Sequence, residues 1–239
     1  MKILSIIQAR VGSSRLPGKS IRMIQGKPIL EHIVNFIKFS KLIDEIIIAT
    51  STHKEDDKIE ELSKKIGVIC FRGSYDDVLK RYYDCAKKYG GDLIVRLAAD
   101  NPLIDPTIVD EVIRVCKETK CDYASNMIHQ TFPLGYLVEV MTFSTLKKLH
   151  ENQHEKLSRE HVTHFIRHNP QLFNIKEIYA PPDLHRSHWR LTVDYEEDFN
   201  LISEIFSHLY VQNSFIKYRS VVEFLEGHSH LLKINENKS

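Results

Sequence analysis

Three basic side chains stand close together near the start of the chain, in the stretch QARVGSSRLPGKS. Arg10, Arg15 and Lys19 alternate there with small residues such as Gly12 and Ser13. Small residues leave backbone N–H groups free, and guanidinium and ammonium groups add positive charge, a combination that suits phosphate oxygens. The alternative is a solvated basic loop, but the stretch directly follows a buried, strand-like run. The loop therefore predicts a phosphate-binding site.

The same stretch ends in Gly-Lys-Ser, as the phosphate loop of a P-loop kinase does. That motif has four residues between its first Gly and the Gly-Lys pair. Gly12 and Gly18 are separated by five residues, one of which is a proline. The count disfavours a P-loop kinase and leaves the type of phosphate site open.

Two aspartates each follow an apolar, strand-like run. Asp100 follows DLIVRLAA and precedes Asn-Pro, and Asp194 follows WRLTV. Ligands of open α/β sheets bind outside the carboxyl ends of the strands, and carboxylates are ligands that Mg²⁺ accepts. Each aspartate could instead cap a turn or a helix. Opposite a cationic loop, Asp100 and Asp194 predict a site for Mg²⁺ and a triphosphate.

Alternating strand-like and helix-like runs in the first half of the chain must position these residues. Strand-like runs cover residues 3–7, 45–50, 68–71 and 92–100, and helix-like runs cover residues 28–39, 54–65, 76–89 and 106–119. Short apolar strands separated by single helices are typical of a mostly parallel sheet with right-handed crossovers. We therefore predict an α/β fold, in which Asp105 caps the last of these helices.

The pattern changes after about residue 125 without a Gly/Ser linker or a block of charge. Strand-like runs follow at 136–141, 173–178 and 189–194, and helix-like runs at 144–149, at 158–168 and after Asp194. We predict one domain over 1–239, with an α/β core (1–125), an α+β extension of it (about 126–180), and a return to the core (181–239). The tail 235–239 is expected to be frayed.

Composition limits the partners and the compartment. The net charge is +1, from 33 basic and 32 acidic residues, so no global field attracts nucleic acid or an anionic membrane. The four scattered cysteines form no CxxC pair, and the N-terminus does not resemble a signal peptide. No apolar run approaches the roughly 20 residues that span a bilayer. We expect a cytoplasmic protein that neither inserts into membranes nor binds nucleic acid.

Several motifs together resemble the cytidylyltransferases of the spore-coat polysaccharide (SpsF-like) type, which are relatives of the enzymes that activate 3-deoxy-manno-octulosonate and acylneuraminate with CTP. The motifs are IIQARVGSSRLPGK, GKPILEH, DEIIIATS, FRGSYDDVLKRYY, ADNPLIDP, SREHVTHFIRHNP and WRLTVDYEED. The resemblance covers roughly residues 2 to 205. It implies a Rossmann-like, GT-A-like nucleotidyltransferase fold: a three-layer sandwich with a small dimer-forming flap.

The resemblance also implies transfer of a nucleoside monophosphate from an NTP to a sugar or sugar acid, with release of pyrophosphate, for surface glycan biosynthesis. By match of motif, Arg10, Arg15 and Lys19 would bind the β- and γ-phosphates, and Asp100 and Asp194 would hold Mg²⁺. The full nucleotide set is Gln8, Ala9, Arg10, Gly12, Ser13, Arg15, Lys19, Ser74 and Asp77, and the acceptor set is Glu139, Arg159 and His161. Asp77 could instead supply helix N-terminal charge, and Arg159 could form a surface ion pair.

Two departures from the family pattern concern the metal loop and the flap. The family commonly reads Gly-Asp-Cys-Pro where this chain has Ala-Asp-Asn-Pro around Asp100, which keeps the carboxylate. In the flap, Leu134 and Leu137 replace two aspartates of the family. If those aspartates contact the acceptor in relatives, this chain takes a different acceptor.

Alternatives to a CTP-dependent enzyme remain. A guanylyl- or other NTP transferase that acts on a sugar 1-phosphate is open, because nothing in the loop identifies the base. A GT-A-type glycosyltransferase would use a completed nucleotide sugar, but such enzymes usually carry Asp-x-Asp, which Asp100-Asn101-Pro102 does not match. A binding module without catalysis is kept open by the replaced flap aspartates.

Overall fold

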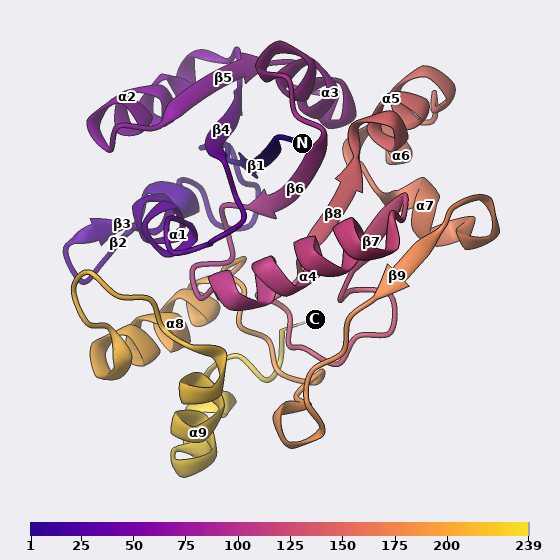
Figure 1. Ribbon diagram of the computed structural model, residues 1–239. Coiled ribbons are helices and arrows are strands. Elements are labelled where there is room, and N and C mark those ends of the chain that lie inside the picture. The colour runs from indigo at the N-terminus through magenta and orange to yellow at the C-terminus, as the bar shows by residue number, and fades with distance from the viewer. Residues whose placement is uncertain (239) are drawn as a thin grey trace.

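A seven-stranded sheet forms the centre of the molecule, which a computed structural model describes over residues 1–238 (Figure 1). Its strands are β1 (Ile3–Gln8), β4 (Glu45–Ser51), β5 (Ile69–Gly73), β6 (Leu93–Ala98), β7 (Tyr123–Ser125), β8 (Glu139–Thr142) and β9 (Ile175–Glu177). A separate two-stranded ribbon consists of β2 (Met23–Ile24) and β3 (Lys27–Pro28). The α-helices are α1 (Ile29–Ile37), α2 (Asp57–Lys65), α3 (Val78–Tyr89), α4 (Pro106–Thr119), α5 (Phe143–Asn152), α6 (Lys156–Glu160), α7 (His164–His168), α8 (Glu196–Leu209) and α9 (Tyr218–Gly227).

The strand order is β5-β4-β1-β6-β8-β7-β9. The first four strands of this order are parallel, β8 is antiparallel to both of its neighbours, and β9 is parallel to β7. Only β8 therefore runs against the others, and the predicted mostly parallel sheet is confirmed. Strands from the second half of the chain extend the same sheet, because β8 pairs directly with β6.

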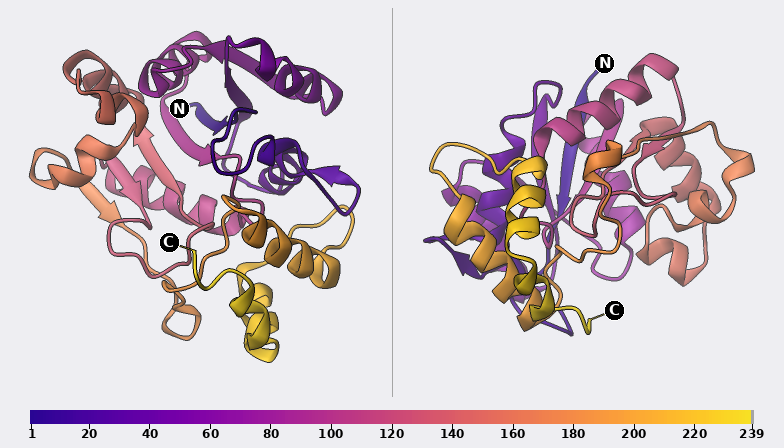
Figure 2. Two further views of the ribbon diagram at one scale, coloured as in Figure 1. Left: turned by 180° about the vertical axis from the view of Figure 1, so that it is seen from behind. Right: turned by 90° about the horizontal axis from the view of Figure 1, so that it is seen from below.

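Helices cover both faces of the sheet, as the views in Figure 2 show. One layer contains α1, α2, α4, α8 and α9 and packs on one face of the sheet, whereas α3, α5, α6 and α7 pack on the other. Alternate residues of β6 serve the two layers: Val95 and Leu97 point into the first, and Ile94 points into the second. The predicted three-layer α/β arrangement is confirmed.

Helix capping explains where the helices nearest the site begin. The side chain of Asp105 accepts a hydrogen bond from the backbone N–H of Thr107 at 2.8 Å and caps α4, as predicted. Asp77 caps α3 in the same way through the N–H of Lys80, so this helix begins at Val78, two residues later than predicted.

Two predicted elements of the second half differ in the structure. The run 189–194 is extended but is not a strand, because its only ladder contact is an isolated bridge between Leu134 and Arg190. The predicted helix 158–168 is divided into α6 and α7 at residues 161–163. The N–H of His164 donates to the backbone oxygen of His161 at 2.6 Å, which is a tighter turn than that of an α-helix, and Val162 and Thr163 are buried there.

The predicted fraying of 235–239 is wrong at its first residue. Asn235 is buried, and its amide donates hydrogen bonds to the backbone oxygen of Arg190 at 2.9 Å and to Asp198 at 2.8 Å. Ser239 lies outside the described residues.

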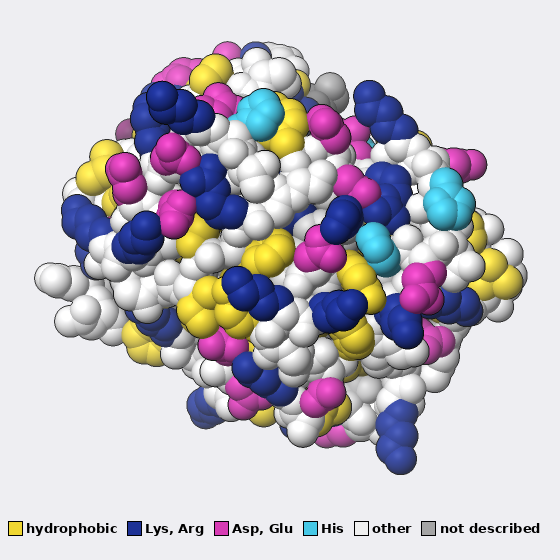
Figure 3. All heavy atoms as spheres, turned by 90° about the horizontal axis from the view of Figure 1, so that it is seen from above, with side chains coloured by type: hydrophobic (Ala, Val, Ile, Leu, Met, Phe, Trp, Pro, Cys, Tyr) yellow, Lys and Arg dark blue, Asp and Glu magenta, His cyan; other side chains and the backbone are white. Residues whose placement is uncertain are grey.

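The surface seen in Figure 3 mixes Lys and Arg with Asp and Glu, and hydrophobic side chains gather only in separate groups on that face. This mixture agrees with the nearly balanced net charge of +1. Across residues 1–238, no helix has both the length and the apolar character needed to cross a bilayer.

Candidate active site

A cleft of about 800 Å³ opens at the edge of the sheet where β1 and β6 end. Predicted site residues that line it are Gln8, Ala9, Arg10, Gly12, Ser13, Arg15, Lys19, Asp100 and His161. Glu55, Tyr75, Arg96 and Glu160 also line it, although the sequence had not assigned any of them to the site. The cleft therefore joins the basic loop, the end of β6 and the break between α6 and α7.

Backbone hydrogen bonds and one buried carboxylate fix the basic loop. The N–H of Gly18 donates to the backbone oxygen of Val11 at 2.9 Å, and Gly18 itself adopts the left-handed φ of 72° that favours glycine. Asp56 is buried and accepts from the N–H of Val11 at 2.7 Å. A Cβ on Gly12 would lie 2.4 Å from the carboxylate of Glu55, an exposed side chain that can turn away.

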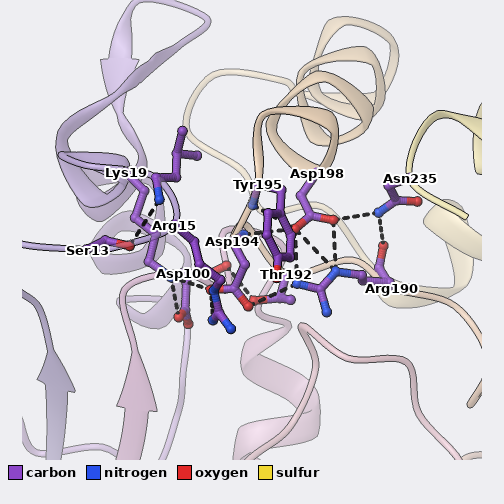
Figure 4. A network of polar contacts seen from close by, with 11 residues as sticks. Ser13, Arg15, Lys19, Asp100, Arg190, Thr192, Asp194, Tyr195, Asp198 and Asn235 are labelled. Atoms are coloured by element: carbon purple, nitrogen blue, oxygen red, sulfur yellow. Dashed lines mark hydrogen bonds and ion pairs between the residues drawn. The ribbon is translucent and has the colours of Figure 1, made fainter. Parts of the chain in front are cut away.

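Lys19 connects the loop to both predicted metal ligands (Figure 4). Its Nζ donates to Asp100 Oδ2 at 2.8 Å and to Asp194 Oδ1 at 2.7 Å. Burial opposes the charge of Lys19, but the attraction of Asp100 and the hydrogen bonds that Lys19 donates to both carboxylates outweigh it and raise the pKa of the ammonium group. Lys19 is therefore charged at neutral pH and brings together two carboxylates that are far apart in the sequence.

Asp194 also receives two guanidinium groups. Arg15 contacts its Oδ1 at 2.6 Å, and Arg190 contacts its Oδ2 at 3.0 Å. Burial favours the protonated form of Asp194, but hydrogen bonds from Lys19 and Arg15 outweigh burial and lower the pKa of this carboxyl group. Asp194 is therefore held as a carboxylate between three cations.

The backbone of Asp100 holds the segment that carries Asp194. Its carbonyl oxygen accepts from the N–H of Val193 at 2.8 Å and from the hydroxyl of Thr192 at 3.1 Å. Asp194 thus reaches the sheet edge through these two hydrogen bonds and not as the last residue of a strand. The predicted location of Asp194 is correct, although the predicted strand before it is wrong.

Behind Asp194, a buried aspartate fixes the outer part of the network. Asp198 is 0% exposed and accepts from Arg190 Nε at 3.0 Å, from the N–H of Asp194 at 2.9 Å and from Asn235 at 2.8 Å. In the sequence alone, Asp198 is sufficiently explained by its place in the first turn of a helix, where an acidic residue complements the helix N-terminus. The signal for its contacts in the sequence was that Asp198 follows Asp194 by four residues and Arg190 by eight.

Asp100 and Asp194 form a donor set that fits magnesium. Each places a carboxylate oxygen within 2.8 Å of the same Lys19 nitrogen, so the two oxygens converge on one point. Mg²⁺ is typically held by one or two carboxylates and takes its remaining ligands from water and substrate phosphates. Among residues 1–238 no cluster of three or more His, Cys, Asp or Glu side chains could hold a metal ion.

Two predicted nucleotide contacts, Ser74 and Asp77, lie outside the lining of the cleft. The Ser74 hydroxyl accepts from the N–H of Asp77 at 3.1 Å. Asp77 forms an ion pair with Arg159, which also donates to the backbone oxygen of His150 at 2.9 Å. Tyr75, between the two, does line the cleft, and the Arg10 guanidinium lies 5.2 Å from the centre of its ring.

The predicted acceptor residues divide between the cleft and the interior. His161 lines the cleft, because the break between α6 and α7 turns it away from the helix surface. Arg159 joins α6 to the start of α3 through Asp77. Glu139 is 2% exposed and binds Arg96 and the Tyr123 hydroxyl.

The flap leucines do not line the cleft either. Leu134 contributes its backbone to hydrogen bonds with Trp189 and Leu191, at 3.2 and 2.7 Å. A Cβ on the intervening Gly135 would lie 2.3 Å from the backbone oxygen of Leu191. This segment therefore packs tightly on 189–191, and Leu134 and Leu137 are both absent from the residues that form the cleft wall.

A family model and two related proteins match most of this chain. The family model described as "Cytidylyltransferase" matches residues 4–224. Uncharacterized protein MJ1063 of Methanocaldococcus jannaschii is 40% identical over 237 residues, which cover 99% of this chain and 96% of that protein. Spore coat polysaccharide biosynthesis protein SpsF of Bacillus subtilis is 34% identical over 209 residues, which cover 85% and 86%.

Solved structures show the same similarity. A cytidylyltransferase from Leptospira borgpetersenii serovar Hardjo-bovis superposes with a TM-score of 0.92 at 33% identity and covers 100% of this chain and 98% of its own. CMP:2-keto-3-deoxy-manno-octonic acid synthetase, solved with CTP, superposes with a TM-score of 0.67 at 17% identity over 87% of this chain and 99% of its own. The second likeness concerns the fold, which is the nucleotidyltransferase fold predicted from the sequence.

Proposed function

Because this chain belongs to the cytidylyltransferase family and is a nucleotidyltransferase, we propose that it transfers CMP from CTP to a sugar acid and releases pyrophosphate. The observation that carries the proposal is the position of Lys19 between Asp100 and Asp194, beside a loop that contains Arg10 and Arg15. A triphosphate and a divalent cation need this combination of convergent carboxylates and mobile cations.

In this proposal an acceptor oxygen attacks the α-phosphorus in line, and the bond from that phosphorus to the oxygen that bridges the β-phosphate breaks. Arg10, Arg15 and Lys19 bind the β- and γ-phosphates and neutralise the charge that the leaving pyrophosphate gains. When bound, Mg²⁺ would be held by Asp100 and Asp194 and would supply positive charge to the phosphate oxygens. The chain's own contribution is positioning and electrostatics, without a covalent intermediate.

Lys19 has two roles in this scheme because its partners differ before and after substrate binds. Without a nucleotide it neutralises the two carboxylates. With Asp100 and Asp194 holding Mg²⁺, the Lys19 ammonium would be free to bind a phosphate oxygen. Its length and flexibility suit such an exchange.

The acceptor and the biological setting rest on relatives. The 34% identity to SpsF supports a sugar destined for a surface polysaccharide.

We also propose that the protein is cytoplasmic and that two copies of the chain form a homodimer through residues 126–180. The exposed apolar side chains of Leu157, Leu172 and Tyr179 on this segment support dimerisation, and light scattering coupled to gel filtration tests it. The four cysteines are free thiols, which supports a reducing compartment.

Pyrophosphate release tests the proposal. The protein and Mg²⁺ are incubated with CTP, GTP, UTP or ATP and with a panel of sugar acids and sugar 1-phosphates. We expect release with CTP and at least one sugar acid. Release only with another NTP and a sugar 1-phosphate would replace the substrate assignment, and consumption of a nucleotide sugar without pyrophosphate would indicate a glycosyltransferase.

A further inference from the structure

A charged group that the proposed chemistry does not use lines the cleft at β6. Arg96 is at a position of this strand that faces the layer of α3 and α5–α7, opposite Glu139 in the ladder between β6 and β8. Its side chain is 20% exposed and borders the same cleft as Lys19 and His161. The cleft therefore has a second cationic region, away from the basic loop.

The contacts of Arg96 leave one nitrogen available. Nη1 donates to Glu139, whose other carboxylate oxygen accepts from the Tyr123 hydroxyl at 2.6 Å. Nε is buried without a partner. Within residues 1–238, Nη2 has no hydrogen-bond partner. It is therefore the nitrogen that can donate a hydrogen bond to a molecule in the cleft.

Glu139 is the ion-pair partner of Arg96. Glu55 and Glu160 also line the cleft, but within residues 1–238 neither forms an ion pair with Arg96. The carboxylate that faces Arg96 is therefore already bound on both of its oxygens, by Arg96 and by Tyr123.

Stability alone gives a weak reason for this arrangement. A buried ion pair seldom stabilises a fold more than well-packed apolar residues of the same size do. The neighbouring inward position of β6 on the same face, Ile94, shows the apolar residue that the layer otherwise accepts. The arrangement instead fixes Nη1 through Glu139, which Tyr123 also binds, in a side chain that lines the cleft.

We propose that Arg96 is a specificity-determining residue that binds an anionic group of the acceptor through Nη2, with Glu139 as the positioning residue that orients its guanidinium. This inference rests on the proposed function. Arg96 lies in β6 and Asp100 in the turn that follows it, and both line the cleft. An anionic group of the acceptor would give Nη2 a charge-assisted partner that a neutral sugar lacks.

Binding of defined probes tests the inference without turnover. Titration calorimetry in the presence of CMP compares 3-deoxy-manno-octulosonate, its uncharged methyl ester and mannose 1-phosphate. We expect the wild type to bind one of the two anions at least about tenfold more tightly than the ester, because a charge-assisted hydrogen bond is lost with the ester. The carboxylate and phosphate arms identify which anion the site prefers.

Variants assign that preference to the residue. Arg96→Gln should abolish the difference between anion and ester, whereas Arg114→Gln, on the exposed face of α4, should preserve it, and Arg96→Lys should restore part of it. The double variant Arg96→Gln/Glu139→Gln removes both buried charges, and urea unfolding verifies its fold. It should also lose the preference.

Two results would overturn the inference: equal affinity of the wild type for anions and ester, or an anion preference that survives in a folded Arg96→Gln or double variant. Pyrophosphate release is measured separately on the wild type, so a failure of the proposed function is distinguishable from a failure of the Arg96 assignment.

Discussion

At the scale of single residues, the candidate site depends on the balance between one lysine and two carboxylates. Lys19 Nζ lies 2.8 Å from Asp100 and 2.7 Å from Asp194, yet the two aspartates have different surroundings. Asp194 is also bound by Arg15 and Arg190, whereas the side chain of Asp100 is more exposed and pairs with Lys19. Substitution of Asp100 therefore separates function from folding better than substitution of Asp194 does.

We expect Asp100→Asn to lower the rate of pyrophosphate release at least about 100-fold, in the range seen when one transition-state contact is removed. The free energy of unfolding in urea should change by less than about 1 kcal/mol, because a partly exposed ion pair contributes little. Asp183→Asn, at an exposed ion pair with Arg219, is the matched control and should leave the rate unchanged. An active, folded Asp100→Asn protein would mean that the metal is held elsewhere.

The lowered pKa of Asp194 predicts how stability depends on acid. A carboxyl group whose pKa is lower in the folded state stabilises the fold at pH values above its unfolded value, about 4. This contribution is lost as the pH falls through the folded pKa. Urea unfolding from pH 7 to pH 2 should therefore show a shallower acid loss for Asp194→Asn than for the wild type, and parallel curves would contradict the assignment.

At the scale of elements, the site is assembled by segments that are not regular secondary structure. The extended run 189–194 is attached to Asp100 by backbone hydrogen bonds and to the first turn of α8 by Asp198. Asn235, after α9, closes the network by donating to both Asp198 and the backbone of Arg190. The last part of the chain thus contributes directly to the position of Asp194.

Asn235→Ala tests this contribution. The change removes two hydrogen bonds in a buried position, so we expect a loss of roughly 1–3 kcal/mol in the free energy of unfolding. Asn152→Ala, which removes an exposed hydrogen bond to the backbone of Lys148, should cost much less. If the two variants unfold alike in urea, Asn235 does not hold the network together.

At the scale of the whole molecule, one sheet connects the two halves of the chain. The pair β6 and β8 joins the parallel strands of the first half to β7 and β9. The cleft has walls from both halves, because Lys19 and Asp100 come from the first and His161 from the second. A sheet shared in this way favours one cooperative unit over two independent domains.

This predicts a single unfolding transition. The one tryptophan, Trp189, is 7% exposed and lies in the second half, so its fluorescence reports there, whereas far-ultraviolet circular dichroism reports on the whole chain. The two urea curves should coincide. A tryptophan transition that precedes the loss of secondary structure would show that 181–238 unfolds separately from the core.

Local patterns in the sequence determined the α/β class, the order of elements in the first half, the cationic loop and the two aspartates beside it. Burial on both faces of parallel strands leaves an apolar run that can be recognised without a structure, and a charged residue after such a run, as Asp100 is, lies at the sheet edge by topology. Asp194 follows no strand, and tertiary contacts decided its position, because Asp100 and Leu134 bind the backbone of 189–194. The division of 158–168 accompanies the burial of Val162 and Thr163.

The tertiary structure alone decided which charges meet. Lys19 and Asp194 are 175 residues apart, and Asp198 and Asn235 are 37 apart. The orientation of Arg96 by Glu139 likewise depends on the register between β6 and β8. Hydrophobic periodicity records how each segment is buried, but it carries no information about which distant side chain lies opposite, because that depends on how the whole sheet and its two helix layers pack together.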